Sequence, residues 1–221
     1  MQRIDVIGSG RVGSAVAARL RERGVSVGCD APELVLLCVP DAAIAEVAAG
    51  IPVGPWVAHV SGATPLAELA PHVRRFSVHP LQTFTRSRGP EQLDGAWAAV
   101  TAESDEARAV GRELAETLGL RPFDLEDSQR TLYHAGAVFA SNYVVALERA
   151  AALLFESAGA PPEALVPLMQ RTIENGFELT GPISRGDWPT VEAHRAAIRD
   201  RRPELESLYE TLAGATLALA T

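Results

Sequence analysis

The strongest constraint on the fold is a glycine-rich turn between a strand-like run and a helical segment at the start of the chain. The run RIDVI leads into the turn, and SAVAARLRERG follows it with helical periodicity. The turn consists of Gly8, Ser9, Gly10, Arg11, Val12 and Gly13. This order of strand, glycine turn and helix is that of a dinucleotide-binding motif. Its glycines permit a tight turn, close approach of the backbone to a diphosphate, and close packing of helix on strand.

We therefore expect this turn to bind a cofactor diphosphate. Free N–H groups and the helix dipole favour an anion at this end of a helix. Arg11 either adds a positive charge or is a surface side chain without a ligand. A glycine turn that serves only packing is the alternative for the whole motif.

The segment after this helix is too short to complete a nucleotide-binding sheet. Only VSVGCDAPE separates the helix from LVLLCVPD, whereas a parallel crossover needs about a dozen residues or more. We expect the adenosine side of the sheet to be cut short and the cofactor to bind more weakly than in a complete fold. Asp30 stands where an acid for the ribose belongs, but a turn or helix cap beside Pro32 is the alternative. No basic cluster follows that would select a 2′-phosphate, so NAD and NADP both stay open.

The pattern of the chain changes near residue 125. Before it, strand-like runs alternate with helical segments, which predicts an α/β, Rossmann-like domain with a mostly parallel sheet over residues 1–125. The runs are RIDVI, LVLLCV, WVAHV, RFSVH, AWAAV and LRPFDL. After it, the stretch from Glu126 to Gly159 lacks proline and is apolar nearly all round, which predicts one long buried helix. Three more helices complete a predicted all-α domain over residues 126–221.

The composition excludes several classes of function. A formal net charge of −8 argues against a nucleic-acid partner, because phosphate backbones are bound by basic faces. No apolar run approaches the roughly 20 residues that cross a bilayer, and no charged leader precedes the first strand, so we expect no membrane contact and a cytoplasmic location. Cys29 and Cys38 form no metal-binding pattern, so we expect reduced thiols and no metal site.

Six segments in this order give the chain a wider resemblance. They are GSGRVGSAVAARL, LVLLCVPDAAIAEVA, VAHVSGA, FSVHPLQTF, LYHAGAVFASNYVVAL and LTGPISRGD. Together they resemble a family of bacterial Rossmann-like NADP oxidoreductases whose C-terminal helical domain has no known function. More distantly, the chain is similar to pyrroline-5-carboxylate reductases, prephenate dehydrogenases and β-hydroxyacid dehydrogenases. The resemblance implies NAD or NADP as cofactor and a homodimer made through the helical domain.

The resemblance also implies where the cofactor contacts lie. Five residues at two strand ends match such contacts: Val39, Pro40, Asp41, Ser61 and Gly62. The first three match the loop beside the diphosphate and the nicotinamide ribose. His79, in a His-Pro pair, matches a position at the nicotinamide edge, although a strand-end histidine held by a backbone carbonyl is the alternative. Open α/β sheets in general bind ligands at the carboxyl ends of strands.

A hydride transfer also needs a group that polarises or protonates a carbonyl or imine. His134, Ser141 and Asn142 recur at two-turn spacing on the predicted long helix and would share one face. If that face covers the carboxyl end of the sheet, His134 is the general acid and Asn142 orients the substrate. Related β-hydroxyacid dehydrogenases have a lysine one turn before this asparagine; this chain has none there, which leaves histidine as the substitute. An imidazole satisfied inside a helical interface is the alternative, and Tyr133 is assigned to packing.

Three functions fit these features. The first is an NAD(P)-dependent oxidoreductase acting on a small hydroxy acid, keto acid or imine. The second is a non-catalytic nucleotide sensor or dimeric scaffold, and the third is a reductase that uses a deazaflavin. The loop with Thr180, Ser184 and Arg185 either closes over an anionic substrate or is a turn in which Asp187 caps the next helix.

Overall fold

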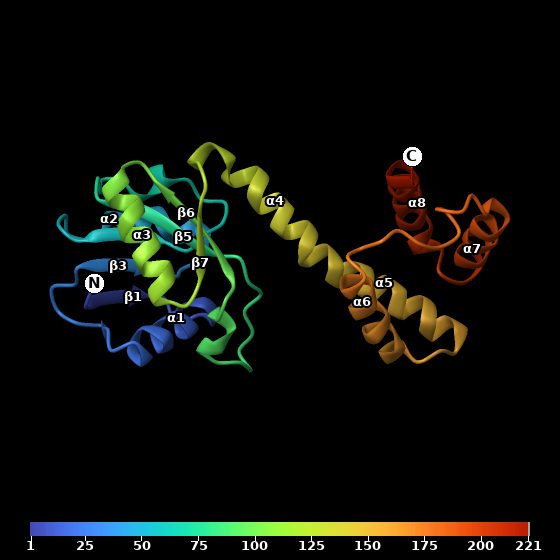
Figure 1. Cartoon of the computed structure of the whole chain (residues 1–221), viewed down its shortest axis with the longest axis horizontal. Helices are drawn as coiled ribbons and strands as arrows, with labels where there is room; N and C mark the ends of the chain where they lie inside the picture. The colour runs from blue at the N-terminus through green and yellow to red at the C-terminus, as the bar shows by residue number, and fades with distance from the viewer. Residues whose placement is uncertain (221) are drawn as a thin grey trace. The chain divides into compact units, whose positions relative to one another are not determined.

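The computed structural model describes residues 1–220, which divide into a sheet unit, Met1–Phe139, and a helical unit from Ala140 onward (Figure 1). The strands of the sheet unit are β1 (Arg3–Ile7), β2 (Ser26–Val27), β3 (Leu34–Leu37), β4 (Trp56–His59), β5 (Arg75–Pro80), β6 (Trp97–Ala102) and β7 (Arg121–Asp124). They form one sheet in the order β2-β1-β3-β4-β5-β6-β7. The pair β5 and β6 is antiparallel and the other pairs are parallel. The predicted α/β class with a mostly parallel sheet is confirmed.

The sheet is short at its β2 edge. β2 has 2 residues, which pair with Arg3 and Ile4 of β1. Residues 28–33 then lead to β3 on the other side of β1 without an intervening helix. Asp30 lies exposed in this link. The connection is thus too short for a further strand and helix, as the spacing of the sequence indicated.

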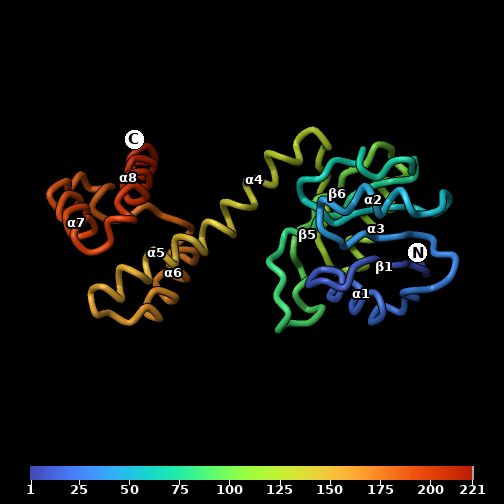
Figure 2. The backbone as a smooth tube through the Cα atoms, turned by 180° about the vertical axis from the view of Figure 1, so that it is seen from behind, coloured from blue at the N-terminus to red at the C-terminus, as the bar shows by residue number. Residues whose placement is uncertain are grey.

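Helices cover both faces of the sheet. On one face, α1 (Arg11–Glu22), the 3₁₀ helix η3 (Pro90–Leu93) and α3 (Asp105–Thr117) enclose a core that includes Leu20, Phe76 and Leu114. On the other face, α2 (Ile44–Ala49) and η2 (Leu66–Leu69) enclose a smaller core around Leu37 and Val57. Figure 2 shows the same elements from behind. The remaining elements of this unit are η1 (Asp41–Ala43), η4 (Asp127–Gln129) and α4 (Arg130–Ala140).

The start of α4 belongs to the sheet unit by its contacts. The last strand ends at Asp124, next to the boundary that the change in pattern predicted, but the first compact unit extends to Phe139. Contacts that tie α4 to the sheet include that of Arg130, whose buried side chain donates a hydrogen bond to Thr101 of β6. A helical sequence pattern can therefore begin inside the unit that the sheet forms.

The helical unit consists of two pairs of neighbouring helices. Its elements are α5 (Asn142–Ala158), η5 (Pro162–Ala164), α6 (Leu165–Glu174), α7 (Trp188–Arg201), η6 (Pro203–Leu205) and α8 (Glu206–Ala220). In both views α5 lies beside α6 and α7 beside α8 (Figures 1 and 2). The two pairs are joined where the Nε atom of Arg202 donates to the hydroxyl of Ser157 at 2.7 Å.

The predicted long helix is divided into two helices, and in the single chain most of its surface is uncovered. Ser141 has φ −127° and ψ −71°, outside the helical region, so α4 ends at Ala140 and α5 begins at Asn142. Most side chains of α4 and α5 are also exposed or half-buried; Arg130 and Ala152 are the buried ones. A segment that is apolar all round is buried only where a partner surface covers it.

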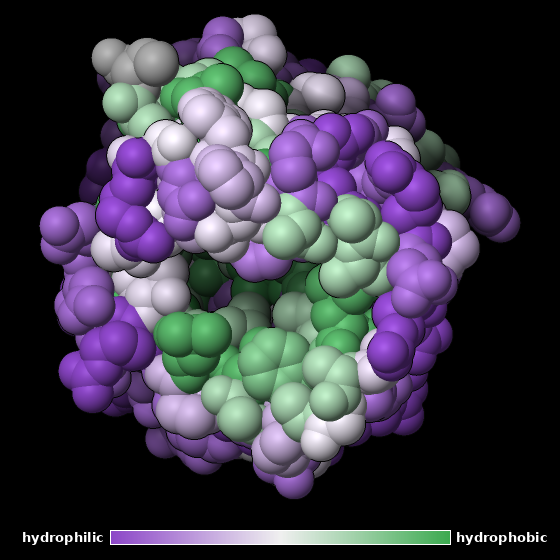
Figure 3. Space-filling model, turned by 90° about the vertical axis from the view of Figure 1, so that its right-hand side faces the viewer, coloured by the Kyte–Doolittle hydropathy of each residue, from purple (hydrophilic) through white to green (hydrophobic). Residues whose placement is uncertain are grey.

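The helical unit exposes many large apolar side chains. Val145, Leu168 and Phe177 are 67%, 61% and 72% exposed, and Figure 3 shows hydrophobic side chains around a hollow on the face that it draws. By length and composition alone, the segment Asp127–Ala158 is apolar enough to cross a membrane, so the length argument against a membrane does not hold for it. Core helices of soluble proteins pass the same test, but only 6% of the most apolar section is buried here. Taken by itself, the helical unit therefore leaves an apolar surface uncovered.

Candidate active site

The glycine turn joins β1 to α1 at the carboxyl edge of the sheet. Gly8 has φ +117°, and a Cβ atom there would lie 2.4 Å from the carbonyl oxygen of Cys38. A Cβ atom on Gly13 would lie 2.0 Å from the carbonyl oxygen of Gly8. No side chain fits at either position, because both glycines let backbone segments approach closely. The same contact places Val39, whose nitrogen would lie 3.3 Å from a Cβ on Gly8, against the turn.

Gly10 is the open position of the turn. Nothing lies within 4 Å of its Cβ position. It precedes α1, which has no side-chain cap and no acidic residue in its first turn. The N–H of Ser14 donates to the carbonyl oxygen of Gly10 at 2.9 Å, so the N–H groups before it, from Arg11 to Gly13, are those that a helix start leaves for an anion. The turn fits the diphosphate of a dinucleotide.

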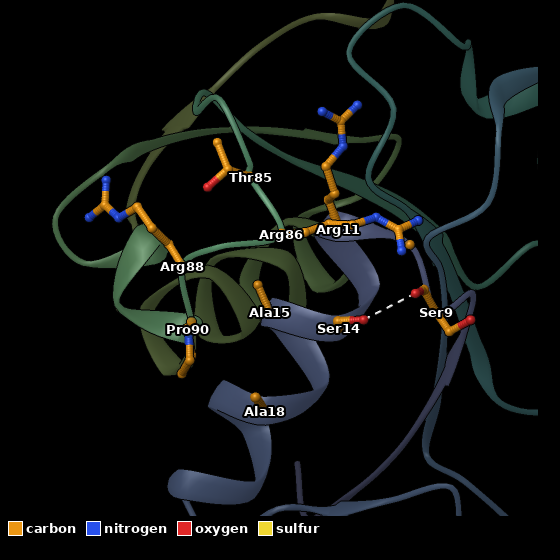
Figure 4. A pocket seen from close by; sticks show the side chains of 11 residues that line it. Ser9, Arg11, Ser14, Ala15, Ala18, Thr85, Arg86, Arg88 and Pro90 are labelled. Atoms are coloured by element: carbon orange, nitrogen blue, oxygen red, sulfur yellow. Dashed lines mark hydrogen bonds between the residues drawn. The ribbon is translucent and has the colours of Figure 1, made fainter.

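A pocket of about 300 Å³ opens beside this helix start (Figure 4). The turn and α1 contribute Ser9, Gly10, Arg11 and Ser14 to its lining. The hydroxyl of Ser14 donates to the carbonyl oxygen of Ser9 at 3.1 Å and braces the turn. The loop after β5 contributes Arg86 and Arg88, whose nearness to the turn was not predicted because they are distant from it along the chain.

The loop after β4 uses Ser61 in its own turn. The Ser61 hydroxyl accepts hydrogen bonds from the N–H groups of Ala63 and Thr64, at 3.2 and 3.0 Å, and donates to the Thr64 hydroxyl at 2.9 Å. The N–H of Ser61 donates to the Nδ1 atom of buried His59 at 3.2 Å. Ser61 therefore shapes the strand end at which cofactor contacts were predicted, with its hydroxyl already engaged.

Gly62 lies against two imidazole rings. A Cβ atom on it would lie 2.6 Å from the Cδ2 atom of His134 and 2.9 Å from the Nε2 atom of His79. The two rings are 5.9 Å apart and inclined at 77°. The structure thus brings together three residues that were predicted from separate parts of the sequence.

His79 is hydrogen-bonded to Tyr133. Its Nδ1 atom lies 2.8 Å from the tyrosine hydroxyl. Burial lowers the pKa of His79 to about 4; the charges of His134 and Arg130 act in the same direction, and that of Asp41 opposes them. Burial also raises the pKa of Tyr133 to about 12. Tyr133 is therefore a neutral partner of a neutral imidazole at pH 7, a role beyond the packing that was predicted.

Arg130 connects the strand ends to α4. It is 1% exposed, its Nη1 atom donates to the hydroxyl of Thr101 at 2.9 Å, and its Nη2 atom donates to the carbonyl oxygen of Ser61. Its Nε atom has no hydrogen-bond partner within residues 1–220 and lies 3.8 Å from a carboxylate oxygen of Asp127. Burial lowers the pKa of Arg130, and the charge of Asp127 opposes this shift only in part. The spacing of Arg130, Tyr133 and His134 is the signal from which their shared helix face could have been predicted.

The other histidines have structural contacts. Burial lowers the pKa of His59 to about 3. The Nε2 atom of buried His72 lies 2.9 Å from the carbonyl oxygen of Ala48, and the Nδ1 atom of His194 lies 2.9 Å from the hydroxyl of Tyr209. These contacts give His59, His72 and His194 structural or surface roles.

Asn142 and the loop before α7 lie in the helical unit. Asn142 begins α5, and its Oδ1 atom accepts from the hydroxyl of Ser141 at 3.0 Å. The break at Ser141 removes the continuous helix on which a face shared with His134 was predicted, so the role of Asn142 stays a prediction. Asp187 caps α7, as predicted, by accepting from the N–H and hydroxyl of Thr190 at 3.3 and 2.7 Å.

Comparison with known proteins identifies a family that this chain matches and solved structures that share its fold. The family described as a domain of unknown function, DUF2520, matches residues 96–216. A solved structure from Bacteroides fragilis, provisionally described as an NADP oxidoreductase, is 25% identical with a TM-score of 0.83, covering 98% of both chains. A Thermotoga maritima protein is 23% identical with a TM-score of 0.78, covering 98% of this chain and 97% of that one. Among curated proteins, no sequence matches.

A more distant likeness is that to prephenate dehydrogenase from A. aeolicus, solved with hydroxyphenyl propionate and NAD⁺. It is 17% identical with a TM-score of 0.58, covering 99% of this chain and 97% of that one. At this level of identity the likeness shows the fold alone. Together these matches confirm the resemblance that the sequence segments indicated.

Proposed function

We propose, from the premise that this chain belongs to the DUF2520 family, that it is an NAD(P)-dependent oxidoreductase. Its substrate would be a small hydroxy acid, keto acid or imine. One observation carries the proposal: an uncapped helix start after a glycine turn and the pair His79 and His134 lie at the same edge of one sheet. The description of the Bacteroides fragilis protein and the NAD⁺ in the prephenate dehydrogenase complex support this class.

The glycine turn would hold NAD or NADP by its diphosphate. The open backbone at Gly10 and the N–H groups that follow it suit an anion, and Arg11 lines the same pocket. The loop from Val39 to Asp41 adjoins the turn on the side of β3. When bound, the nicotinamide supplies or accepts the hydride.

Residues of the chain itself would supply the proton that the reaction needs. His134 would donate the proton that a new hydroxyl or amine needs and regain it from water. His79, whose pKa burial lowers to about 4, is neutral at pH 7 and would act as a hydrogen-bond partner rather than as an acid. Gly62 leaves room for both imidazoles, and Arg130 holds α4 over the strand ends. In this proposal Asn142, from the helical unit, orients the substrate.

The proposal includes a homodimer in which a second copy covers the exposed apolar side chains of the helical unit. Large exposed apolar patches mark interaction surfaces. Val145 and Leu168 are more than half exposed. A cytoplasmic location and the lack of a nucleic-acid partner, which the net charge of −8 disfavours, belong to the same proposal.

A spectroscopic titration tests the class of function. Saturable binding of NADH or NADPH, abolished by Gly10→Asp, is expected, followed by oxidation of the reduced cofactor with a keto acid or imine from a small panel. Binding of a reduced deazaflavin in place of NADH and NADPH would select that cofactor instead. Nucleotide binding without turnover of any substrate in the panel would favour the sensor or scaffold.

A further inference from the structure

The pocket beside α1 has a wall that the glycine motif does not explain. The loop Thr85–Pro90 lies across the pocket from Ala15 and Ala18 of α1 (Figure 4). This loop carries Arg86 and Arg88, and Arg11 at the start of α1 adds a third guanidinium group. The pocket is thus lined by cationic side chains from two elements that are distant along the chain.

The charge of this lining differs from that of the chain. The whole chain has a net charge of −8, yet the lining contains three arginines and no acidic residue. The Nε atom of Arg88 lies 3.6 Å from a carboxylate oxygen of Glu91. Arg11 and Arg86 form no ion pair within the part of the chain that the structure describes. Unpaired positive charges around a concave site attract an anion.

Buried Gln92 holds the loop in place. It is 2% exposed; its Oε1 atom accepts from the N–H of Thr85 at 2.8 Å, and its Nε2 atom donates to the carbonyl oxygen of Arg88 at 2.9 Å. From α1, the Nη2 atom of Arg19 donates to the carbonyl oxygen of Pro90 at 2.9 Å. The backbone that carries the two loop arginines is therefore preorganised, which lowers the entropic cost of binding a ligand.

We infer that Arg86 and Arg88 form the second half of a phosphate site, opposite the helix start of α1, and that the ligand is the diphosphate of a dinucleotide. Backbone N–H groups at the start of α1, beginning with that of Arg11, would bind the anion from one side, and the guanidinium groups would bind it from the other. A pocket of about 300 Å³ is at the lower end of the range for ligand sites, so it takes part of a dinucleotide. For the dinucleotide, this inference rests on the proposed function.

The short β2 edge explains why a second set of charges is needed. A strand of 2 residues offers little surface to an adenosine. A larger share of the binding free energy must then come from the phosphates, and such binding weakens steeply as salt is added.

Calorimetry with NADH, NADPH, ADP-ribose and inorganic pyrophosphate tests the inference. Arg86→Gln and Arg88→Gln are each expected to raise the Kd of all four ligands about tenfold, the effect of losing one charge-assisted hydrogen bond. Both variants should also show a weaker dependence of the Kd on salt. Arg23→Gln removes the same charge at the exposed far end of α1 and should leave every Kd unchanged.

The outcomes separate this inference from the proposed function. Wild-type affinity for NADPH, NADH and pyrophosphate in both loop variants overturns the inference and leaves the proposed function standing. Pyrophosphate binding that depends on Arg86, without binding of either dinucleotide, supports the two-sided phosphate site but overturns the dinucleotide as its ligand, and with it the oxidoreductase. An effect confined to NADPH assigns the pocket to the 2′-phosphate and overturns the diphosphate assignment.

Discussion

The Nδ1 atom of His79, at the end of β5, lies 2.8 Å from the hydroxyl oxygen of Tyr133 on α4. This bond joins a sheet strand to the helix that also carries His134. Burial lowers the pKa of His79 to about 4 and raises that of Tyr133 to about 12, so both groups are neutral at pH 7. A neutral pair of this kind orients a ring without competing for the proton of the reaction.

Tyr133→Phe removes this hydrogen bond and keeps the ring. We expect kcat to fall about tenfold, the effect of one hydrogen bond in the transition state, with the Kd for NADPH unchanged. Tyr209→Phe is the matched control, because it breaks a tyrosine–histidine bond of 2.9 Å in the helical unit. If Tyr133→Phe keeps the kcat of the wild type, the side chain of Tyr133 serves packing alone.

His134→Gln removes the proposed proton donor and retains a polar side chain of similar size. A positioned general acid contributes about 10² to 10⁴ in rate, so kcat should fall by at least about 10². Binding of NADPH should be nearly unchanged in a fluorescence titration. Loss of cofactor binding together with kcat would instead place His134 in the cofactor site.

Gly10→Asp and Gly8→Ala should fail in different ways. Nothing lies near a Cβ on Gly10, so the aspartate variant should fold with an unchanged Tm while its carboxylate repels the diphosphate. An alanine at Gly8 would place its Cβ 2.4 Å from a carbonyl oxygen at φ +117°, so this variant should lose stability. Thermal unfolding and cofactor titration of both variants check this. An unchanged affinity of Gly10→Asp for the cofactor would mean that the glycine turn serves packing alone.

Acid should destabilise the sheet unit through its buried imidazoles. The pKa values of His59 and His79 in the folded chain are about 3 and about 4, against about 6.5 when unfolded. Below pH 6.5 the unfolded chain binds protons that the folded chain does not, so the free energy of unfolding falls as the pH falls from about 6.5 to about 3, with the share of His79 complete by about 4. A pKa difference of one corresponds to about 1.4 kcal/mol, which puts the total loss on the order of several kcal/mol.

Urea unfolding between pH 7.5 and pH 4.5 measures this effect. His79→Gln should flatten the fall, whereas His194→Gln, at an exposed position, should not. An equal slope in wild type and His79→Gln would show that His79 is protonated in the folded chain.

A charge on the apolar face of the helical unit should separate the proposed homodimer. Val145→Glu and Leu168→Glu place a carboxylate at positions 67% and 61% exposed, so each chain should still fold but elute as a monomer in light-scattering chromatography. Val73→Glu, at a position 86% exposed in the sheet unit, should remain dimeric. A monomeric wild-type protein that floats with lipid vesicles would assign the apolar face to a membrane.

The sheet was predictable because its signals are local. Each of the strand-like runs forms a strand, and Gly8 and Gly13 occupy the tight positions that the motif requires. The short link after β2 followed from chain length alone. The break at Ser141 was not predictable, because no proline or glycine marks the position.

The site was predictable in part, because some of its residues also have local signals in the sequence. Gly62, His79 and His134 were chosen separately, and the fold brings them into contact. Arg86 and Arg88 were missed because their proximity to the glycine turn depends on how the loop after β5 packs against α1. Tyr133 was missed because an aromatic ring on an apolar helix is usually packing, and only the position of its hydroxyl shows otherwise.

The shortness of β2 bears on which molecules the protein can tell apart. Two residues at an edge give a purine ring almost nothing to stack on or to hydrogen-bond with. Dinucleotides in which hypoxanthine replaces adenine should then serve nearly as well as the natural compounds. The protein would then distinguish dinucleotides by their nicotinamide end and by their ionic charge, and hardly at all by the base.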